Sequence, residues 1–222
     1  GIVMAGNIPL VGFHDFLSVF ISGHRQTIKL SSKDDVLLDA IINYLYRIDE
    51  DVRSYISIAD NLRGCDAYIA TGSNQTSKYF EQYFSKYPNI IRKNKTSVAI
   101  LSGNESNDEL EKLSDDIHLF FGLGCRNVTK IYVPSGYDFV PLLASFKKYT
   151  YFRDHHKYAN NYDYQLSLML LNNQYYMTNE STLLSEQLPI FSAISVLHYG
   201  YYEDAEKLSA ELHRNEDIQC IA

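Results

Sequence analysis

A cysteine flanked by glycines is the side chain in this sequence best suited to covalent chemistry. Cys125 follows Gly122 and Gly124 and lies between a predicted helix and a predicted strand. Glycines let the backbone approach a reacting carbonyl closely, and a nearby cation or helix end favours the nucleophilic thiolate. Arg126 is such a cation. A small buried cysteine in a tight turn is the alternative interpretation, and the local sequence does not separate the two.

A second candidate is the junction at Thr71-Gly72-Ser73, which ends a predicted strand and opens a predicted helix. Free backbone N–H groups and the positive end of a helix favour a phosphate, and the Ser73 hydroxyl adds a donor. The alternative is an ordinary strand–helix turn with a serine N-cap. No GxGxxG motif and no Walker lysine lie nearby, so neither of these standard nucleotide motifs is present.

Two polar residues follow other predicted strands. Lys29 ends the second strand and Asn7 follows the first one. The carboxyl ends of parallel strands form the edge of a sheet at which ligands bind. A solvated lysine and an asparagine that hydrogen-bonds its own turn are the alternatives at these positions.

The adjacent histidines His155 and His156 do not predict a metal site. Neighbouring residues point in different directions in a helix or strand, and no third ligand has a suitable spacing. Either imidazole remains a candidate proton donor or acceptor. The other two cysteines, Cys65 and Cys220, are expected to fill the core. The three cysteines form no CxxC pair, which suits a reducing cytoplasm.

The elements that must position these residues alternate between strands and helices. Such alternation predicts an α/β fold: a Rossmann-like parallel sheet over residues 1–103, followed by a second α/β domain over residues 104–222. The expected strands cover 2–5, 26–30, 55–59, 66–71, 97–101, 128–133, 192–199 and 218–221. The expected helices cover 13–21, 32–48, 74–87, 108–121, 138–149 and 203–213, while 165–171 fits either type.

The composition of the chain argues against nucleic acid and the membrane interior as its partners. With 222 residues, 45% apolar and 21% charged, the chain is an ordinary globular protein with a core of useful size. Its net charge of −7 argues against nucleic acid as a partner. No apolar run approaches the roughly 18 residues of a membrane span, and no signal peptide is evident, so we expect a cytoplasmic protein. Strand-like runs at both ends suggest that both domains are truncated pieces of a longer protein.

Several of these motifs, taken in order, resemble the aldehyde dehydrogenase superfamily. The similar segments are Asn7-Ile8-Pro9 (Asn-x-Pro), Lys29-Leu30-Ser31-Ser32 (Lys-Pro-Ser/Ala-Glu), Thr71-Gly72-Ser73 (Thr-Gly-Ser), Gly122-Leu123-Gly124-Cys125 (Gly-x-x-Cys) and the run 190–197 (Ile-Phe-Gly-Pro-Val). The segments 4–11, 121–128 and 155–163 look more specifically like the LuxC-like acyl-CoA reductases, which are longer at both ends.

The resemblance implies a fold, a mechanism and a cofactor site. It implies an aldehyde-dehydrogenase-like cofactor domain followed by a catalytic domain, in which Cys125 attacks an acyl-CoA or other acyl thioester and coenzyme A leaves. The Asn7 side chain and the Cys125 backbone N–H would stabilise the oxyanion. The implied cofactor-binding residues are Lys29, Ser31, Ser32, Gly72 and Ser73.

Departures from the superfamily pattern refine these expectations. The Glu-Leu-Gly-Gly motif, whose Glu activates deacylating water, is replaced by Ile91-Arg92-Lys93-Asn94. Slow hydrolysis of the acyl-enzyme favours a reductase. Ser32 replaces the carboxylate that bonds the adenosine ribose, so a 2′-phosphate is tolerable and NADPH is favoured, with NADH as the alternative. Pro189 stands where the family has the Glu of its Glu-x-Phe motif.

The expected function is therefore NADPH-dependent reduction of a long-chain acyl-CoA to the aldehyde, in a full-length form that is a homo-oligomer. An aldehyde dehydrogenase that oxidises aldehyde to acid or acyl-CoA is one alternative. The other is an inactive domain that binds a nucleotide or a partner without turnover.

Overall fold

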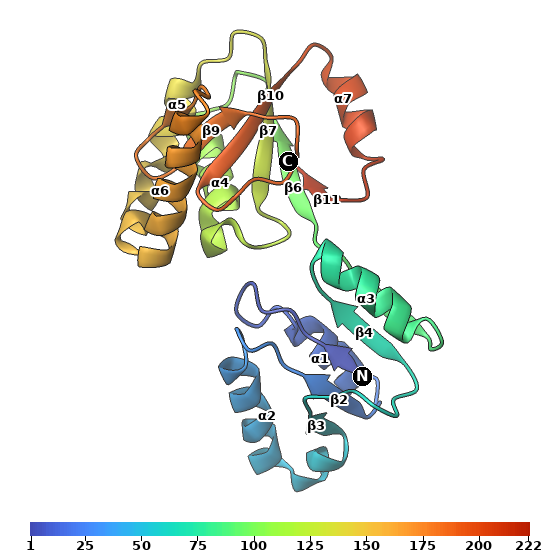
Figure 1. Cartoon of the computed structure of the whole chain (residues 1–222). Coiled ribbons are helices and arrows are strands. Elements are labelled where there is room, and N and C mark those ends of the chain that lie inside the picture. Colours follow the sequence, from blue (N-terminus) through green and yellow to red (C-terminus); the bar gives the residue numbers. More distant parts are fainter. The chain divides into compact units, whose positions relative to one another are not determined.

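The chain divides into two compact units, each built on its own sheet (Figure 1). The structure is a computed structural model that describes residues 1–222. Unit 1 spans Gly1–Asn94 and unit 2 spans Lys95–Ala222. The predicted boundary at residues 103 and 104 is wrong, because the strand Thr96–Ile100 pairs within the second sheet and belongs to unit 2.

Unit 1 contains a five-stranded, all-parallel sheet in the order β3-β2-β1-β4-β5. Its buried positions are mostly apolar, such as Ile2, Ile28 and Ala70 at 2%, 0% and 0% exposure. The strands are β1 (Ile2–Val3), β2 (Gln26–Lys29), β3 (Ile56–Ile58), β4 (Tyr68–Thr71) and β5 (Asn89–Arg92). The strand β5 was not predicted, because it is a short edge strand that is almost entirely exposed.

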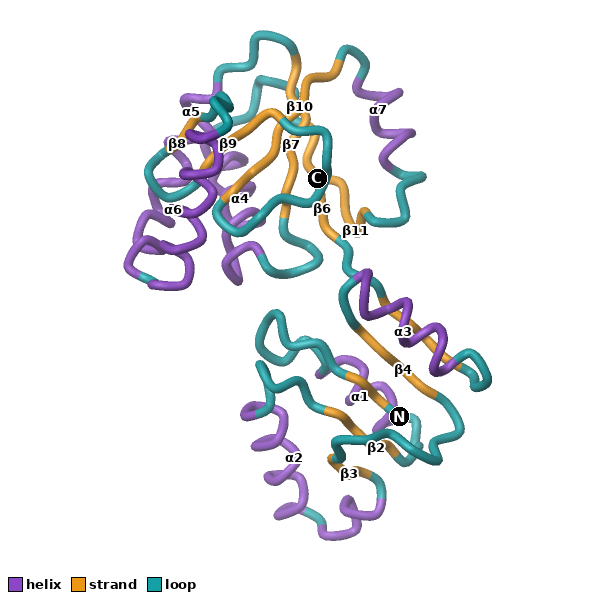
Figure 2. The backbone as a smooth tube through the Cα atoms, in the orientation of Figure 1, coloured by secondary structure: helices purple, strands orange, loops and turns teal.

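Three α-helices connect these strands, and one connection lacks a helix. They are α1 (Phe13–Ile21), α2 (Val36–Ile48), which is followed by the 3₁₀ helix Glu50–Ser54, and α3 (Asn74–Phe84). Phe16, Leu38 and Ile42 bury the apolar faces of α1 and α2 against the sheet. The N-cap of α2 is Asp35, so the helix expected from residue 32 begins four residues later than predicted. The segment 59–67 links β3 to β4 as a loop, which Figure 2 colours teal.

Unit 2 contains a six-stranded sheet in the order β11-β6-β7-β10-β9-β8. All pairs are parallel except the two-residue edge strand β8, which is antiparallel to β9. The strands are β6 (Thr96–Ile100), β7 (Val128–Pro134), β8 (Met177–Thr178), β9 (Leu183–Glu186), β10 (Val196–Tyr202) and β11 (Ile218–Ile221). The strand predicted to begin at Ser192 begins only at Val196, and β8 and β9 were not predicted.

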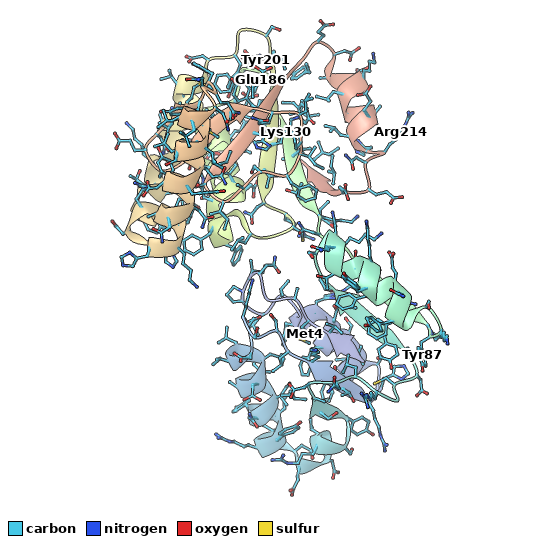
Figure 3. The ribbon with its side chains drawn as sticks, viewed as in Figure 1. Met4, Tyr87, Lys130, Glu186, Tyr201 and Arg214 are labelled. Atoms are coloured by element: carbon cyan, nitrogen blue, oxygen red, sulfur yellow. The ribbon has the colours of Figure 1, made fainter.

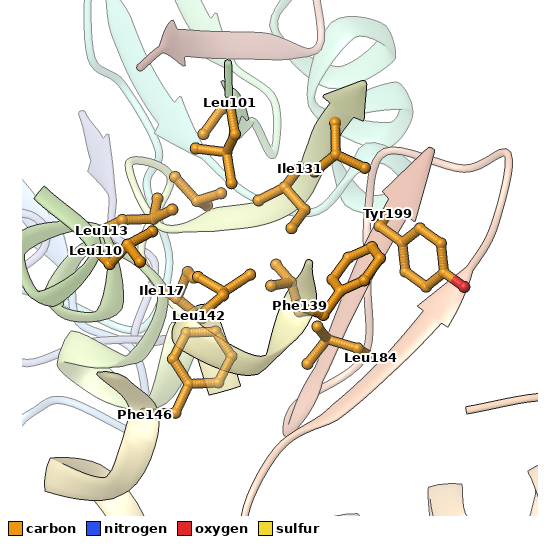
Figure 4. Close-up of a cluster of buried hydrophobic side chains, with 14 residues drawn as sticks. Leu101, Leu110, Leu113, Ile117, Ile131, Phe139, Leu142, Phe146, Leu184 and Tyr199 are labelled. Atoms are coloured by element: carbon orange, nitrogen blue, oxygen red, sulfur yellow. The ribbon is translucent and has the colours of Figure 1, made fainter. Parts of the chain in front are cut away.

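The helices of unit 2 are α4 (Asn107–His118), α5 (Phe139–Ser145), α6 (His156–Leu171) and α7 (Ala205–Leu212), with 3₁₀ segments at Leu119–Gly122 and Phe146–Asp154. A capping box between Ser106 and Glu109 begins α4. Figure 4 shows apolar side chains of α4 and α5 meeting those of the sheet. This cluster is the main core of the unit and fixes the end of α4, after which the cysteine loop begins.

The predicted α/β architecture with parallel sheets is confirmed. The segment 154–163, interpreted only as polar and aromatic, mostly forms the first half of α6. Its polar residues face solvent while Tyr158 and Tyr162, both 4% exposed, supply the buried face.

Candidate functional site

Cys125 lies on the loop between α4 and β7, and it is exposed. The alternative of a small buried cysteine in a turn is therefore wrong. Cys220 is exposed as well and Cys65 is half-buried, so the expectation that both fill the core fails for Cys220. The backbone N–H of Cys125 forms no hydrogen bond within the protein, while its carbonyl accepts one from the Ser97 hydroxyl at 3.2 Å.

The backbone before Cys125 is strained. Phe120 and Phe121 have φ values of 56° and 58°, and Gly122 follows with 72°. A left-handed conformation costs a residue with a Cβ about 1–2 kcal/mol, so two consecutive phenylalanines in it must be held by their surroundings. This turn ends α4 earlier than the sequence predicts and redirects the chain toward Cys125.

Asn127 holds the loop in this shape. Its side chain is 5% exposed and makes three hydrogen bonds to the backbone. The Oδ1 atom accepts from the Gly124 N–H at 2.7 Å, and Nδ2 donates to the carbonyls of Asp116 and Leu119 at 2.8 and 2.9 Å. The loop is therefore fixed on both sides of the strained turn, which positions an exposed thiol on a rigid support.

Phe121 provides the other support of the turn. Its ring contacts Phe152 at 4.5 Å, His155 at 4.9 Å and Tyr158 at 6.0 Å between ring centroids. The structure thus brings His155, at the N-cap of α6, to the base of the cysteine loop. His156 is exposed in the first turn of α6. Proton transfer by either histidine stays a prediction.

A buried histidine lies beneath the same loop. His118, the last residue of α4, is 3% exposed and borders a cavity of about 20 Å³, room for about one water molecule. Its Nδ1 donates to the Ser114 carbonyl and its Nε2 accepts from the Thr182 hydroxyl, both at 2.8 Å, because a carbonyl can only accept. Burial lowers the pKa of His118 to about 4, so the ring is neutral.

Four consecutive carbonyls are bound by side chains in the long loop between β9 and β10. The Lys130 ammonium, labelled in Figure 3, donates to Gln187 and Leu188 at 2.8 Å each. His198 Nδ1 donates to the Pro189 carbonyl at 2.9 Å, and the Thr129 hydroxyl to that of Ile190 at 2.6 Å. The position of Pro189, where the family carries a carboxylate, is thus held rigidly by the sheet beneath it.

In unit 1, the predicted site residues gather at the carboxyl ends of the parallel strands. Asn7 follows β1, Lys29 ends β2, and Gly72 and Ser73 follow β4. The chain moves from β1 toward β2 on one side and returns to β4 on the other, so β1 and β4 form the topological switch point of the sheet. Open α/β sheets bind ligands in the crevice at this point.

The N-terminus of α3 has the features predicted for a phosphate site. Ser73 is its N-cap, and the Ser73 Oγ atom accepts from the Thr76 N–H at 3.2 Å. A Cβ on Gly72 would lie 3.0 Å from the Phe80 ring, so the close packing of this turn favours glycine. The serine N-cap interpretation is confirmed. Phosphate binding at the first N–H groups of the helix stays a prediction, and the cap is compatible with it.

Ser31 and Ser32 lie in the turn after β2. The Ser31 Oγ atom accepts from the Lys33 N–H at 3.3 Å, and a Cβ on Gly6 would clash with it at 2.3 Å. Ser32 is exposed. Asp34 in this turn accepts from the Leu10 N–H at 2.7 Å, so the loops after β1 and β2 are joined.

The end of β5, which the sequence resemblance places at the superfamily's water-activating carboxylate, carries two ion pairs. Arg92 binds the buried Asp15 of α1, and Lys93 binds Glu81 of α3 at 3.0 Å. The two carboxylates near this strand end are thus engaged with cations.

Three residues that fix the loops of unit 2 were not predicted from the sequence: Asn127, His118 and Lys130. Only spacing could have suggested them: Asn127 lies two residues after the cysteine, and His118 lies four residues after Ser114 on one helix face. The carbonyls that these side chains bind are distant in sequence and could not be inferred.

None of the helices combines the length and the apolar character that a membrane-spanning segment requires. No group of three or more His, Cys, Asp or Glu side chains is arranged to hold a metal ion.

Comparison with solved structures identifies the fold. An NAD⁺-bound aldehyde dehydrogenase from Mycobacterium tuberculosis superposes with a TM-score of 0.69 at 14% identity, covering 95% of this chain and 53% of that one. The aldehyde dehydrogenase KauB from Pseudomonas aeruginosa gives 0.70 at 11%, covering 93% and 52%. A 1-pyrroline-5-carboxylate dehydrogenase from Thermus thermophilus gives 0.68 at 11%, covering 96% and 51%. The fold is that of aldehyde dehydrogenases, and the chain spans about half the length of these proteins.

A search of curated proteins found no match. The model of the acyl-CoA reductase (LuxC) family matches residues 2–141, which is more than half of the chain. The matched range includes the strand ends of unit 1, the strained turn and Cys125, and it ends before the segment that begins at His155. The resemblance seen in the sequence is confirmed, and the chain belongs to the LuxC family of acyl-CoA reductases.

Proposed function

We propose that this chain is the core of an NADPH-dependent reductase that converts a long-chain acyl-CoA to the aldehyde through an acyl-cysteine intermediate. The observation that carries the proposal is the exposed Cys125 on a loop that Asn127 and Phe121 hold rigid. A merely structural cysteine would need neither exposure nor a strained approach. Membership of the LuxC family supports the substrate class.

The Cys125 thiolate would attack the carbonyl carbon of the thioester. The new C–S bond forms as the bond to the coenzyme A sulfur breaks, and that thiolate leaves and takes up a proton. The free N–H of Cys125 is one proposed donor to the oxyanion, and the Asn7 side chain is the other. His155 and His156 are proposed proton carriers for the leaving coenzyme A thiolate and for the Cys125 thiolate that is freed when the aldehyde leaves.

The cofactor would bind to unit 1. The open N-terminus of α3 at Gly72 and Ser73 suits a pyrophosphate, and Lys29 with the turn at Ser31 and Ser32 suits the adenosine ribose. When bound, NADPH would supply the hydride that reduces the acyl carbon and frees the cysteine, with NADH as the alternative donor.

The ion pairs at the end of β5 favour reduction over hydrolysis. Asp15 is paired with Arg92, and Glu81 is paired with Lys93. A carboxylate bound to a cation is a poor base toward water. The acyl-enzyme would therefore persist until hydride or a thiol reaches it, which an enzyme that oxidises aldehyde to acid would not allow.

The test is acylation of the chain by a long-chain acyl-CoA, followed by mass spectrometry of each cysteine. Because the chain spans about half of its structural relatives, acylation is measured separately from NADPH oxidation. We expect an acyl adduct on Cys125 and release of coenzyme A, both lost in Cys125→Ser. Cys220→Ser is the matched control, since Cys220 is also exposed. Equal labelling of the two cysteines would contradict the proposal and favour an inactive binding domain.

A further inference from the structure

A wide groove opens on one face of unit 1. Its volume is about 640 Å³. One wall is the loop between β3 and β4, and the other wall is the aromatic face of α3, with the ends of β1 and β2 as the floor. The groove exists because the connection 59–67 has no helix and leaves much of this sheet face uncovered. Phe80, Tyr83 and Phe84 are the aromatic residues that α3 contributes.

Two cations without partners lie in this groove. Lys29 ends β2, Arg63 lies on the opposite loop, and neither side chain forms an ion pair or a hydrogen bond within the protein. Gly64 has a φ of 73°, a left-handed turn directly after Arg63 that a larger residue would adopt only at a cost. An aromatic wall beside two unpaired cations suits a planar base that carries a phosphate.

We propose that Arg63 and Lys29 together bind the 2′-phosphate of NADPH, which makes Arg63 a specificity-determining residue. The inference rests on the proposed function, because it assigns the cofactor to the groove of unit 1. Arg63 offers a guanidinium fork to the phosphate oxygens, and Lys29 adds a second positive charge from the strand end. The adenine lies along the aromatic face of α3.

The presence of Asp60 in the groove argues against recognition of a 2′-phosphate. It lines the same groove and could instead accept the two ribose hydroxyls of NADH. However, Asp60 follows β3, the outermost strand, whereas the carboxylate that recognises a ribose ordinarily follows the strand next to the switch point. At that position this chain has Lys29, so the groove presents two cations against one carboxylate.

The experiment is calorimetric titration of the chain with NADPH, NADH and adenosine 2′,5′-bisphosphate. We expect NADPH to bind at least about tenfold more tightly than NADH, and Arg63→Ala to remove that difference by weakening NADPH about 10- to 100-fold. Lys29→Ala should act in the same direction, and adenosine 2′,5′-bisphosphate should follow NADPH. Arg25→Ala is the matched control, because Arg25 is an exposed arginine at the opposite end of β2.

The other outcomes separate the two proposals. An unchanged ratio of NADPH to NADH affinity in Arg63→Ala overturns the role of Arg63 and leaves the reductase proposal intact. Selective loss of NADH binding in Asp60→Asn shows ribose recognition and also overturns it. Absence of binding by either nucleotide, in a chain that remains folded by circular dichroism, overturns both the role of Arg63 and the assignment of the cofactor to unit 1. Acylation of Cys125 is measured without cofactor and is unaffected by any of these results.

Discussion

The two units of this chain use the same kind of parallel sheet in different ways. Only three of the thirteen buried polar side chains lie in unit 1, namely Asp15, Gln26 and Ser77. The other ten lie in unit 2, and several of them bind backbone carbonyls of loops. Unit 1 leaves its polar groups exposed at the strand ends, where a ligand can replace water. Unit 2 uses its polar groups internally to fix the loops around Cys125.

The difference matches the two tasks in the proposed reaction. Binding of a cofactor needs exposed donors and cations that gain partners only from the ligand. A nucleophile needs its backbone held before the substrate arrives, because reorganisation during the reaction raises the barrier. Substitutions in unit 2 should therefore cost stability and thiol positioning together, whereas substitutions at the strand ends of unit 1 should cost little stability.

Replacement of Asn127 should have the largest effect on stability. Asn127→Ala leaves two carbonyls and one N–H of a strained loop without partners, and we expect a loss of about 3 kcal/mol in the free energy of unfolding. Modification of Cys125 by a thiol reagent should become heterogeneous as the loop relaxes. Urea unfolding measures the first effect and stopped-flow labelling the second. Asn161→Ala is the control, since the half-buried Asn161 donates only one hydrogen bond, to a carbonyl within α6. Equal losses in the two variants would contradict the anchoring role.

The pH dependence of stability tests the burial of His118. Its pKa is lowered from 6.5 to about 4. Between these two pH values the imidazole is protonated in the unfolded chain but neutral in the folded chain. The contribution is complete above pH 6.5 and is lost as the pH falls through this window, by about 3 kcal/mol at most.

His213 supplies a matched control for this measurement. It makes the same contact, from Nδ1 to the carbonyl four residues earlier, at 2.7 Å, but it is exposed. His118→Leu should flatten the slope of stability against pH between 6.5 and 4, and His213→Leu should leave it unchanged. An unchanged slope in His118→Leu means that another group causes the acid sensitivity of unit 2.

Lys130 tests the rigidity of the loop between β9 and β10. Burial lowers the pKa of this lysine, so its charge carries a cost that its two carbonyl bonds offset in part. Lys130→Met should therefore lower stability by only about 1–2 kcal/mol. Hydrogen exchange at the amides of Gln187, Leu188 and Ile190 should accelerate strongly by comparison, because the loop loses two anchors. Lys148→Met is the control, and unchanged exchange in Lys130→Met would show that His198 and Thr129 suffice.

The sequence predicts unit 1 better than unit 2, for a physical reason. In unit 1 the proposed site residues follow strands, and apolar runs mark strand ends, so Asn7, Lys29 and Ser73 could be placed at one edge from local pattern alone. In unit 2 the turn at Phe120 and Phe121 breaks the helical pattern through contacts with α6, which lies far away in sequence. Periodicity therefore extended the helix to residue 121.

The position of the domain boundary was predicted wrongly for a related reason. The strand Thr96–Ile100 reads like the last strand of the first sheet, because nothing local says which sheet a buried strand joins. Its neighbours β7 and β11 begin at residues 128 and 218, and only these long-range pairings decide its membership. Likewise, β8 and β9, of two and four residues, are too short to be distinguished from loop by their sequence pattern.

The smallest expected change in the free energy of unfolding is that of a substitution in unit 1. Ser73→Ala removes the N-cap of α3 and should cost about 0.5–1 kcal/mol, as exposed caps do. Ser85→Ala, at the other end of the same helix, is the control and should cost less. If Ser73 also serves the cofactor phosphate, as proposed, nucleotide affinity should fall several-fold in Ser73→Ala while the stability of unit 2 stays constant. A stability loss as large as that of Asn127→Ala would instead show that unit 1 depends on internal polar contacts as much as unit 2 does.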